Sequence, residues 1–183
     1  FHRTHTSLLQ WFVAMFLVAF DKRGLSALLL SEEIGLKYET AWAMLSRMRH
    51  AMKKRDAAYK LKGYVEIDEM FIGSPSEAKK RGRGTEKTPV LVAVSYVPTK
   101  EKEEVTGFAK MLAVEAIDEE TVTAFVKANV EPGATLRTDG LSVYPTLEKQ
   151  GYTHDRELVR KRKAHLVLPH VHTFISNLRS FVQ

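Results

Sequence analysis

The chain has 183 residues, 44% of them hydrophobic, which is enough for one ordinary domain or for a small domain and a medium one. This composition excludes wholesale disorder. The 28 Lys and Arg against 22 Asp and Glu leave a net charge of +6, which favours a polyanionic partner such as nucleic acid or an anionic membrane surface. The sequence contains no cysteine, which excludes a disulfide framework and a zinc site built on thiolates.

The first predicted element is a helix over residues 8–20, which Thr6 or Ser7 can cap. Its sequence, "LLQWFVAMFLVAF", is too short to cross a bilayer, which takes about 20 residues. Apolar residues occupy nearly its whole circumference, so we expect this helix to be buried. The chain starts without Met and stops inside a helical pattern at Gln183, so we treat it as a fragment.

A helix-turn-helix is predicted over about residues 25–52. Residues 25–34 have a helical pattern, Gly35 supplies a turn, and apolar residues then recur at helical spacing at Ala41, Leu45, Met48 and Met52. Helix pairs with this outline occur in DNA-binding proteins, and they are also common for purely structural reasons. In a recognition helix, the outward residues would be Lys37, Thr40, Arg47, Arg49 and His50.

The periodicity changes from helical to strand-like after residue 60, which predicts a helical region over residues 1–60 and a second domain over residues 61–183. Strands are expected at residues 64–73, 90–97 and 105–114, the second of them buried on both faces. A helix capped by Asp118, a short strand in "ATLRTDG", and two helices over residues 141–149 and 171–183 follow. This order predicts a mixed α/β architecture.

Acidic residues interrupt the first of these strands, "VEIDEMFIG". Residues two apart share a face of a strand, so Glu66 and Asp68 point the same way and Glu69 points to the other side. Buried carboxylates are costly unless they are paired or bind a metal, and the alternative is an edge strand with its acids in water. Asp139 follows another strand, where it suits either a ligand site or a turn. Two carboxylates from separate strands match a magnesium site for phosphate chemistry.

Four sequence blocks together resemble the catalytic domain of bacterial insertion-sequence transposases, specifically insertion-sequence family fifteen-ninety-five. They are "VEIDEMFIG", "KKRGRGTEKTPVLVAV", "LRTDGLSVYPTLEKQGYTH" and "LPHVHTFISNLRSF", and the preceding "FDKRGLSALLLSEEIGLKYETAWAMLSRMRHAM" resembles the helix-turn-helix of the same family. The resemblance implies an RNase H-like core with the Asp-Asp-Glu chemistry of transposases. It implies that Asp68 and Asp139 are ligands of two divalent ions, Mg²⁺ or Mn²⁺.

The third acid of the family pattern is missing. The family places a Glu seven residues before a Lys on the last helix, and His172 and Arg179 occupy those positions here. Seven residues make two helical turns, so the two side chains share a face, whereas His170 lies about 200° away from His172. A sub-group of the family is similar in carrying His, so the resemblance implies that His172 is the third active-site residue and metal ligand and that Arg179 is its basic partner on DNA. Imidazole in place of carboxylate tilts the metal preference toward Mn²⁺.

A basic loop precedes the second predicted strand. It suits a phosphate grip beside the active site, and it also suits a solvated hairpin loop. Its basic residues are Lys79, Lys80, Arg81, Arg83 and Lys87.

From these features and the resemblance we expect a fragment of a DNA transposase, without zinc in this chain, that is cytoplasmic, associated with the nucleoid and independent of membranes. The expected partners are double-stranded DNA, as transposon ends and target, and a second copy of the chain. One alternative is a catalytically inactive DNA-binding regulator derived from a transposase. Another makes the basic surface incidental and places the acids on an edge strand.

Overall fold

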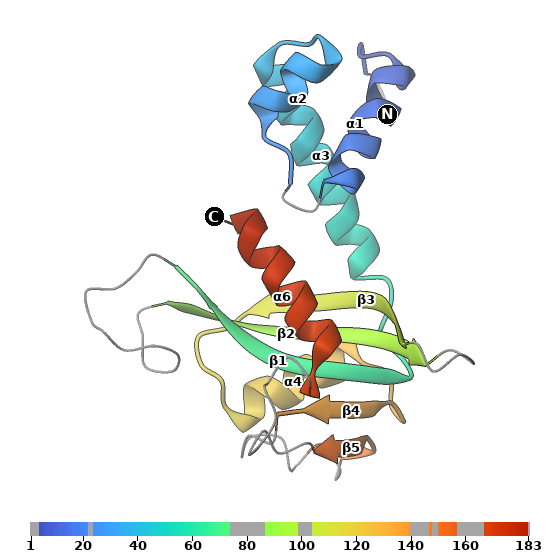
Figure 1. Ribbon diagram of the computed structural model, residues 1–183, viewed down its shortest axis with the longest axis vertical. Helices are drawn as coiled ribbons and strands as arrows, with labels where there is room; N and C mark the ends of the chain where they lie inside the picture. Colours follow the sequence, from blue (N-terminus) through green and yellow to red (C-terminus); the bar gives the residue numbers. More distant parts are fainter. Residues whose placement is uncertain are drawn as a thin grey trace. The chain divides into compact units, whose positions relative to one another are not determined.

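The computed structural model describes residues 4–21, 24–73, 87–98, 104–139, 147, 150–156 and 167–182 (Figure 1). The chain divides into two compact units. One is a helical unit of residues Phe1–Ala58 together with Asn177–Gln183, and the other is an α/β unit of residues Tyr59–Ser176. The last seven residues group with the helical unit in this division, and the predicted domains of residues 1–60 and 61–183 stay predictions.

The helical unit contains α1 (Leu8–Phe20), α2 (Ala27–Ile34) and α3 (Tyr38–Asp56), together with the end of α6 (Pro169–Val182). Ser7 caps α1 in a capping box with Gln10, and Gly35 ends α2 in the left-handed conformation that glycine adopts without strain. No helix in the described ranges is both long enough and apolar enough to cross a membrane. The small core of this unit consists of Trp11, Ala14, Leu30, Ala41, Met44, Leu45 and Met48.

The expectation that α1 is buried was wrong. Only Trp11 and Ala14 are fully buried in this helix, while Phe12, Phe16 and Phe20 are each more than half exposed. A helix that is apolar all round does not reveal from periodicity which side will pack, because every face fits a core equally well. Met52 is also exposed, although it continues the predicted stripe of α3.

The α/β unit contains one five-stranded mixed sheet in the order β3-β2-β1-β4-β5. Strands β1, β2 and β3 are antiparallel neighbours, whereas β4 and β5 run parallel to β1 and to each other. The pattern did not predict β5, and the helix predicted over residues 141–149 lies outside the described residues apart from Leu147. The elements are β1 (Tyr64–Ile72), β2 (Thr88–Pro98), β3 (Glu104–Ala113), α4 (Glu119–Asn129), β4 (Thr135–Thr138), β5 (Thr153–Arg156) and α6 (Pro169–Val182).

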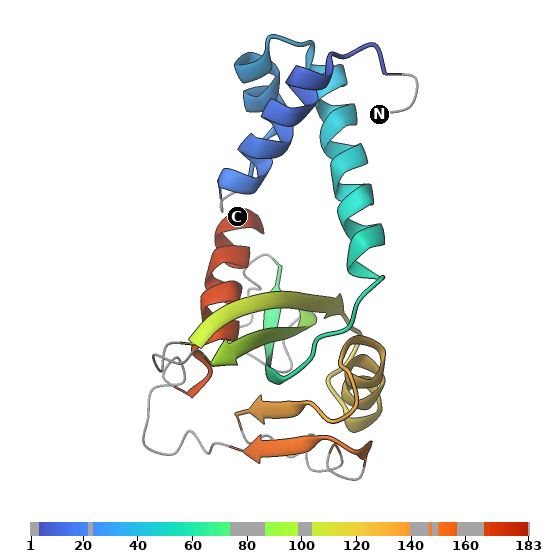
Figure 2. The same ribbon diagram turned by 90° about the vertical axis from the view of Figure 1, so that its right-hand side faces the viewer.

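Helices lie on both faces of this sheet (Figure 2). Alternation along β1 sends Val65 and Ile67 into the core beneath α4, where they meet Phe125. It sends Glu66 and Asp68 to the opposite face, against the start of α6. Because β1 lies between β2 and β4, it is not an edge strand, and the alternative that its acids face water at an edge is contradicted.

A β-bulge in β3 changes which side chains face α6. Ala109 pairs with Val94 and Thr106 pairs with Tyr96, so one extra residue of β3 is accommodated opposite Ser95. The Ser95 hydroxyl donates to the Phe108 carbonyl and accepts from the Phe108 N–H. These two hydrogen bonds give partners to backbone groups that the bulge removes from the ladder of the sheet. Ahead of the bulge, Thr106 consequently shares a face with Tyr96, which it would not do in an unbroken strand.

The core beneath α4 supplies a test of the fold. Phe125 is 1% exposed, and its truncation leaves a cavity that the surrounding side chains cannot close. We expect Phe125→Ala to lower the free energy of unfolding by about 3–5 kcal/mol in urea denaturation. The exposed Lys127→Ala on the same helix is the control and should stay within about 0.5 kcal/mol of wild type. Equal losses in the two variants would contradict the assigned packing.

Candidate active site

Asp68 lies near the middle of β1 on the face that meets α6. Its side chain is 13% exposed, so it is nearly buried but reachable. One carboxylate oxygen, Oδ1, accepts a hydrogen bond from the N–H of Glu69 at 2.9 Å. The other, Oδ2, lies 3.6 Å from Nε2 of His172. A strand residue and a helix residue that are distant in sequence are thus brought together.

His172 projects from the first turns of α6. Its side chain is 29% exposed, more open than Asp68. Its backbone N–H donates to the Leu168 carbonyl, so the helical hydrogen bonding is already established at this residue. The pair offers a carboxylate and an imidazole to one partly open space.

Asp139 directly follows β4, the strand parallel to β1. The register pairs Ile67 with Thr138, so Asp68 and Asp139 are the next two residues in line. Partners in register on adjacent strands point to the same face, and such strands lie about 4.8 Å apart. The fold therefore brings Asp139 to the strand position beside Asp68.

The donor chemistry of these three residues fits a divalent cation. Two carboxylates and an imidazole are oxygen and nitrogen ligands that Mg²⁺ and Mn²⁺ accept. Within the described ranges, no group of three or more His, Cys, Asp or Glu side chains is arranged so that it could hold a metal ion. The agreement of Asp68, Asp139 and His172 with a metal site therefore rests on their residue types and on the strand register.

Glu66 is the residue on this face whose contact sequence reasoning missed. It is 0% exposed, and Oε2 accepts a hydrogen bond from the backbone N–H of Val171 at 2.8 Å. Burial raises the pKa of the Glu66 carboxyl above its ordinary value, and the Val171 hydrogen bond acts in the opposite direction. The signal available in the sequence was the two-residue spacing from Asp68, which reveals a shared face but not the helix end it meets.

His170, which the helical geometry set apart from His172, is held in a cluster of its own. Its ring stacks on Tyr96 at 4.7 Å between centroids, with Nδ1 2.7 Å from the Thr106 hydroxyl and Nε2 3.0 Å from a Glu104 carboxylate oxygen. Burial raises the pKa of Tyr96 to about 12, so its phenol stays protonated. Through the ring stack and these two polar contacts, His170 anchors α6 to β2 and β3.

The candidate DNA-binding residues of the helical unit are solvent-accessible, but they do not form one face. Thr40 and Arg47 are two turns apart on α3 and share a side, whereas Arg49 lies about 200° from Arg47. Arg49 instead lines an open hollow of about 510 Å³ with Ser26 and Phe181. Lys37 and His50 are exposed.

The other basic candidates are only partly described. Lys79, Lys80, Arg81 and Arg83 lie outside the described residues. Lys87 is described and half-buried directly before β2, where its backbone lies next to Gly73 at the end of β1. Arg179 is exposed on α6, two turns beyond His172.

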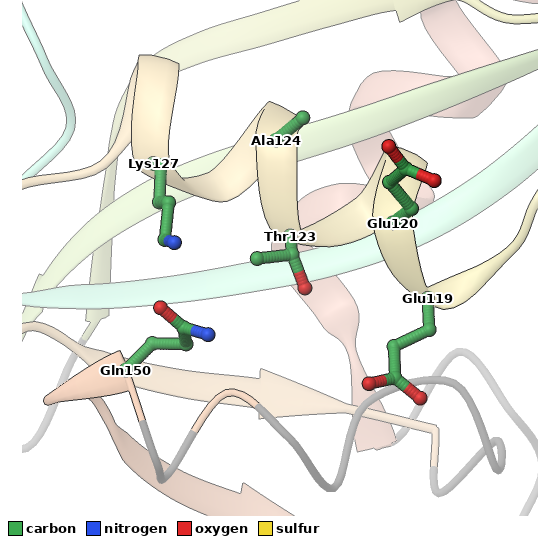
Figure 3. Close-up of a pocket in the computed structure, with 6 residues that line it drawn as sticks. All are labelled: Glu119, Glu120, Thr123, Ala124, Lys127 and Gln150. Atoms are coloured by element: carbon green, nitrogen blue, oxygen red, sulfur yellow. The ribbon is translucent and has the colours of Figure 1, made fainter.

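A second hollow, of about 480 Å³, lies along α4 (Figure 3). Glu119, Glu120 and Lys127 line it together with Gln150, so it mixes both signs of charge. Because α4 covers the face of the sheet opposite Asp68, this hollow is separate from the candidate site.

The chain belongs to a family of transposases. Residues 60–183 match the ISXO2-like transposase domain, which confirms the resemblance to insertion-sequence family fifteen-ninety-five. A bacterial origin and the sub-group with histidine stay predictions. No curated protein matches the sequence.

Solved structures of Mos1 complexes are similar at low identity. The chain matches the Mos1 strand transfer complex at 13% identity and a TM-score of 0.39, over 99% of this chain and 67% of that one. It matches a pre-cleavage Mos1 transpososome at 12% identity and a TM-score of 0.38, over 100% of this chain and 68% of that one.

The two histidines at the start of α6 are expected to differ in their effect on stability. His170→Ala removes a ring stack and two polar contacts from a buried site, so the free energy of unfolding should fall by about 1–3 kcal/mol. His172→Ala, at a partly open position, should change it by less than about 0.5 kcal/mol. Urea denaturation of the two variants side by side measures this difference, and a larger loss from His172→Ala would refute the assignment.

Proposed function

We propose that the chain is part of a DNA transposase that carries out metal-dependent phosphodiester cleavage and strand transfer at the ends of an insertion sequence. The observation that carries the proposal is the 3.6 Å approach of Asp68 and His172, with Asp139 next in strand register. Its α/β unit would be an RNase H-like catalytic domain, which the mixed sheet with helices on both faces supports.

In this function Asp68, Asp139 and His172 would hold the divalent cations, Mg²⁺ or Mn²⁺. When bound, such ions raise the nucleophilicity of an oxygen and stabilise the charge of the leaving oxygen. Cleavage and strand transfer each exchange one P–O bond for another, so the protein's task is to hold the phosphate and neutralise its charge. The partial exposure of Asp68 and His172 suits this task, because DNA must reach them.

Basic residues of α6, of the helical unit and of the predicted loop before β2 would bind the phosphates of the DNA. Arg179 carries a planar guanidinium that matches phosphate in two parallel hydrogen bonds. Lys37, Thr40 and Arg47 of the helical unit would contact the transposon ends, and Arg49 would contact DNA from the other side of α3. The basic residues from Lys79 to Lys87 would grip phosphates. A second copy of the chain would hold the other DNA end, and such a protein would act at the nucleoid in the cytoplasm.

Substitution of the proposed metal ligands tests the proposed reaction. With double-stranded DNA that carries the element's ends, we expect Asp68→Asn and His172→Ala to lower metal-dependent nicking at least about 100-fold, as loss of one charge-stabilising group does. Wild type should nick faster in Mn²⁺ than in Mg²⁺, because an imidazole replaces a carboxylate. Glu119→Gln, on α4 over the opposite face of the sheet, removes the same charge as Asp68→Asn and should leave the rate unchanged.

A different result would favour another function. If wild type binds the DNA ends but cuts them in neither metal, the chain is a DNA-binding regulator derived from a transposase. If it neither binds nor cuts them, its basic surface has another role.

The salt dependence of binding tests the contacts of the helical unit. Each phosphate neutralised by the protein contributes about 1 to the slope of log affinity against log salt concentration. We therefore expect Arg47→Ala to reduce the magnitude of that slope by about 1, as measured by fluorescence anisotropy with labelled ends. Lys127→Ala removes a charge from α4 and should leave the slope unchanged. Equal slopes in all three proteins would argue against Arg47 as a phosphate contact.

A further inference from the structure

Glu66 is an unusual residue for its surroundings. Its carboxyl group is fully buried, and while Oε2 accepts from the Val171 N–H, Oε1 has no hydrogen-bond partner among the described residues. Burying a carboxyl group with incomplete hydrogen bonding is costly, and a leucine of similar size would fill the space without that penalty. Packing alone therefore does not account for a glutamate at this position.

The one hydrogen bond that Glu66 makes is to the start of a helix. Val171 is the third residue of α6, and the first N–H groups of a helix have no partner within it. An acidic group there satisfies a free donor and meets the positive end of the helix dipole. Glu66 therefore ties the first turn of α6 to the central strand of the sheet.

This tie adjoins the Asp68–His172 pair. Asp68 is two residues beyond Glu66 on the same face of β1, and His172 directly follows Val171 on α6. A shift or rotation of α6 that broke the Glu66–Val171 hydrogen bond would also move His172 relative to Asp68. Because the Glu66–Val171 and Asp68–His172 contacts join neighbouring positions of β1 and α6, a change in one is expected to change the other.

We propose that Glu66 is a positioning residue. It fixes the position of α6 along its axis and its rotation about that axis, so that His172 faces Asp68. The proposal rests on the assignment of Asp68 and His172 to the reaction. Glu66 itself is 0% exposed and out of reach of DNA, so it acts through His172 and not on the substrate. His170 contacts Tyr96, Thr106 and Glu104, so β2 and β3 hold the same turn of α6.

Two substitutions separate the hydrogen bond from the packing. Glu66→Gln keeps an oxygen that accepts from the Val171 N–H, whereas Glu66→Leu keeps the size and loses the acceptor. The chain has no cysteine, so the double variant Asp68→Cys with His172→Cys reports the separation of the two positions through a short bifunctional thiol reagent. The double variant Ile72→Cys with Thr88→Cys, a cross-strand pair that does not involve α6, is the control.

We expect Glu66→Leu to slow cross-linking between positions 68 and 172 by up to about tenfold, the change in the docking equilibrium that corresponds to one lost hydrogen bond. With Glu66→Gln, cross-linking should be as fast as in the double-cysteine variant that keeps Glu66. Neither substitution should affect the control pair. Hydrogen exchange should show faster opening of the Val171 amide in Glu66→Leu, while the Phe125 amide of α4 stays protected. In the otherwise unmodified chain, Glu66→Leu should reduce the rate of nicking and leave the affinity for DNA ends unchanged.

Unchanged cross-linking in Glu66→Leu would overturn the proposal, as would a loss in Glu66→Gln equal to that in Glu66→Leu. A simultaneous loss of cross-linking in the control pair would show general unfolding and would also overturn it. Cross-linking and exchange need no activity, so they settle the positioning role even if wild type never nicks DNA. Absence of nicking would count against the proposed function alone.

Discussion

The hydrogen bond between the Glu66 carboxylate and the Val171 N–H joins the central strand of the sheet to the first turn of α6. The arrangement of that face depends on it, because a sheet surface with two carboxyl groups cannot be covered by an ordinary apolar helix without a large desolvation cost. The start of a helix is one of the few elements that can cover such a surface, since it brings free N–H donors and a positive dipole. The charge of β1 and the direction of α6 are thus complementary.

The two faces of β1 show how one strand serves stability and chemistry separately. Val65 and Ile67 lie under α4 in a core of mainly aliphatic and aromatic side chains. Arg137, which pairs with Glu66 in register, extends the polar character of the other face toward Asp155, 3.3 Å away on β5. Because strand alternation keeps these two environments apart, changes in the charged face need not disturb the core.

Much of this architecture could be read from local patterns. The first four strands, the helices capped by Ser7 and Asp118, and the position of Asp139 beyond β4 follow from periodicity, turn residues and capping residues, all of which act within a few positions. The short strand β5 did not show such a pattern. The packing face of α1 could not be read, because its apolar residues surround the helix. The role of Glu66 could not be read either, since its partner Val171 lies 105 residues away and a backbone N–H leaves no trace in residue type. His170 had been set apart by its angle from His172, and its contacts with three strand residues became evident only from the folded chain.

The β-bulge of β3, opposite Ser95, makes the number of residues in that strand as important as their identity. Thr106 and Glu104 reach His170 because one extra residue reverses the alternation of the strand between Ala109 and Thr106. Removing or adding a single residue in this short interval would exchange the two faces of the segment ahead of it and turn Val105 toward the helix in place of its polar neighbours. Relatives that share this anchoring of α6 are therefore expected to tolerate substitutions in this edge strand far better than insertions or deletions.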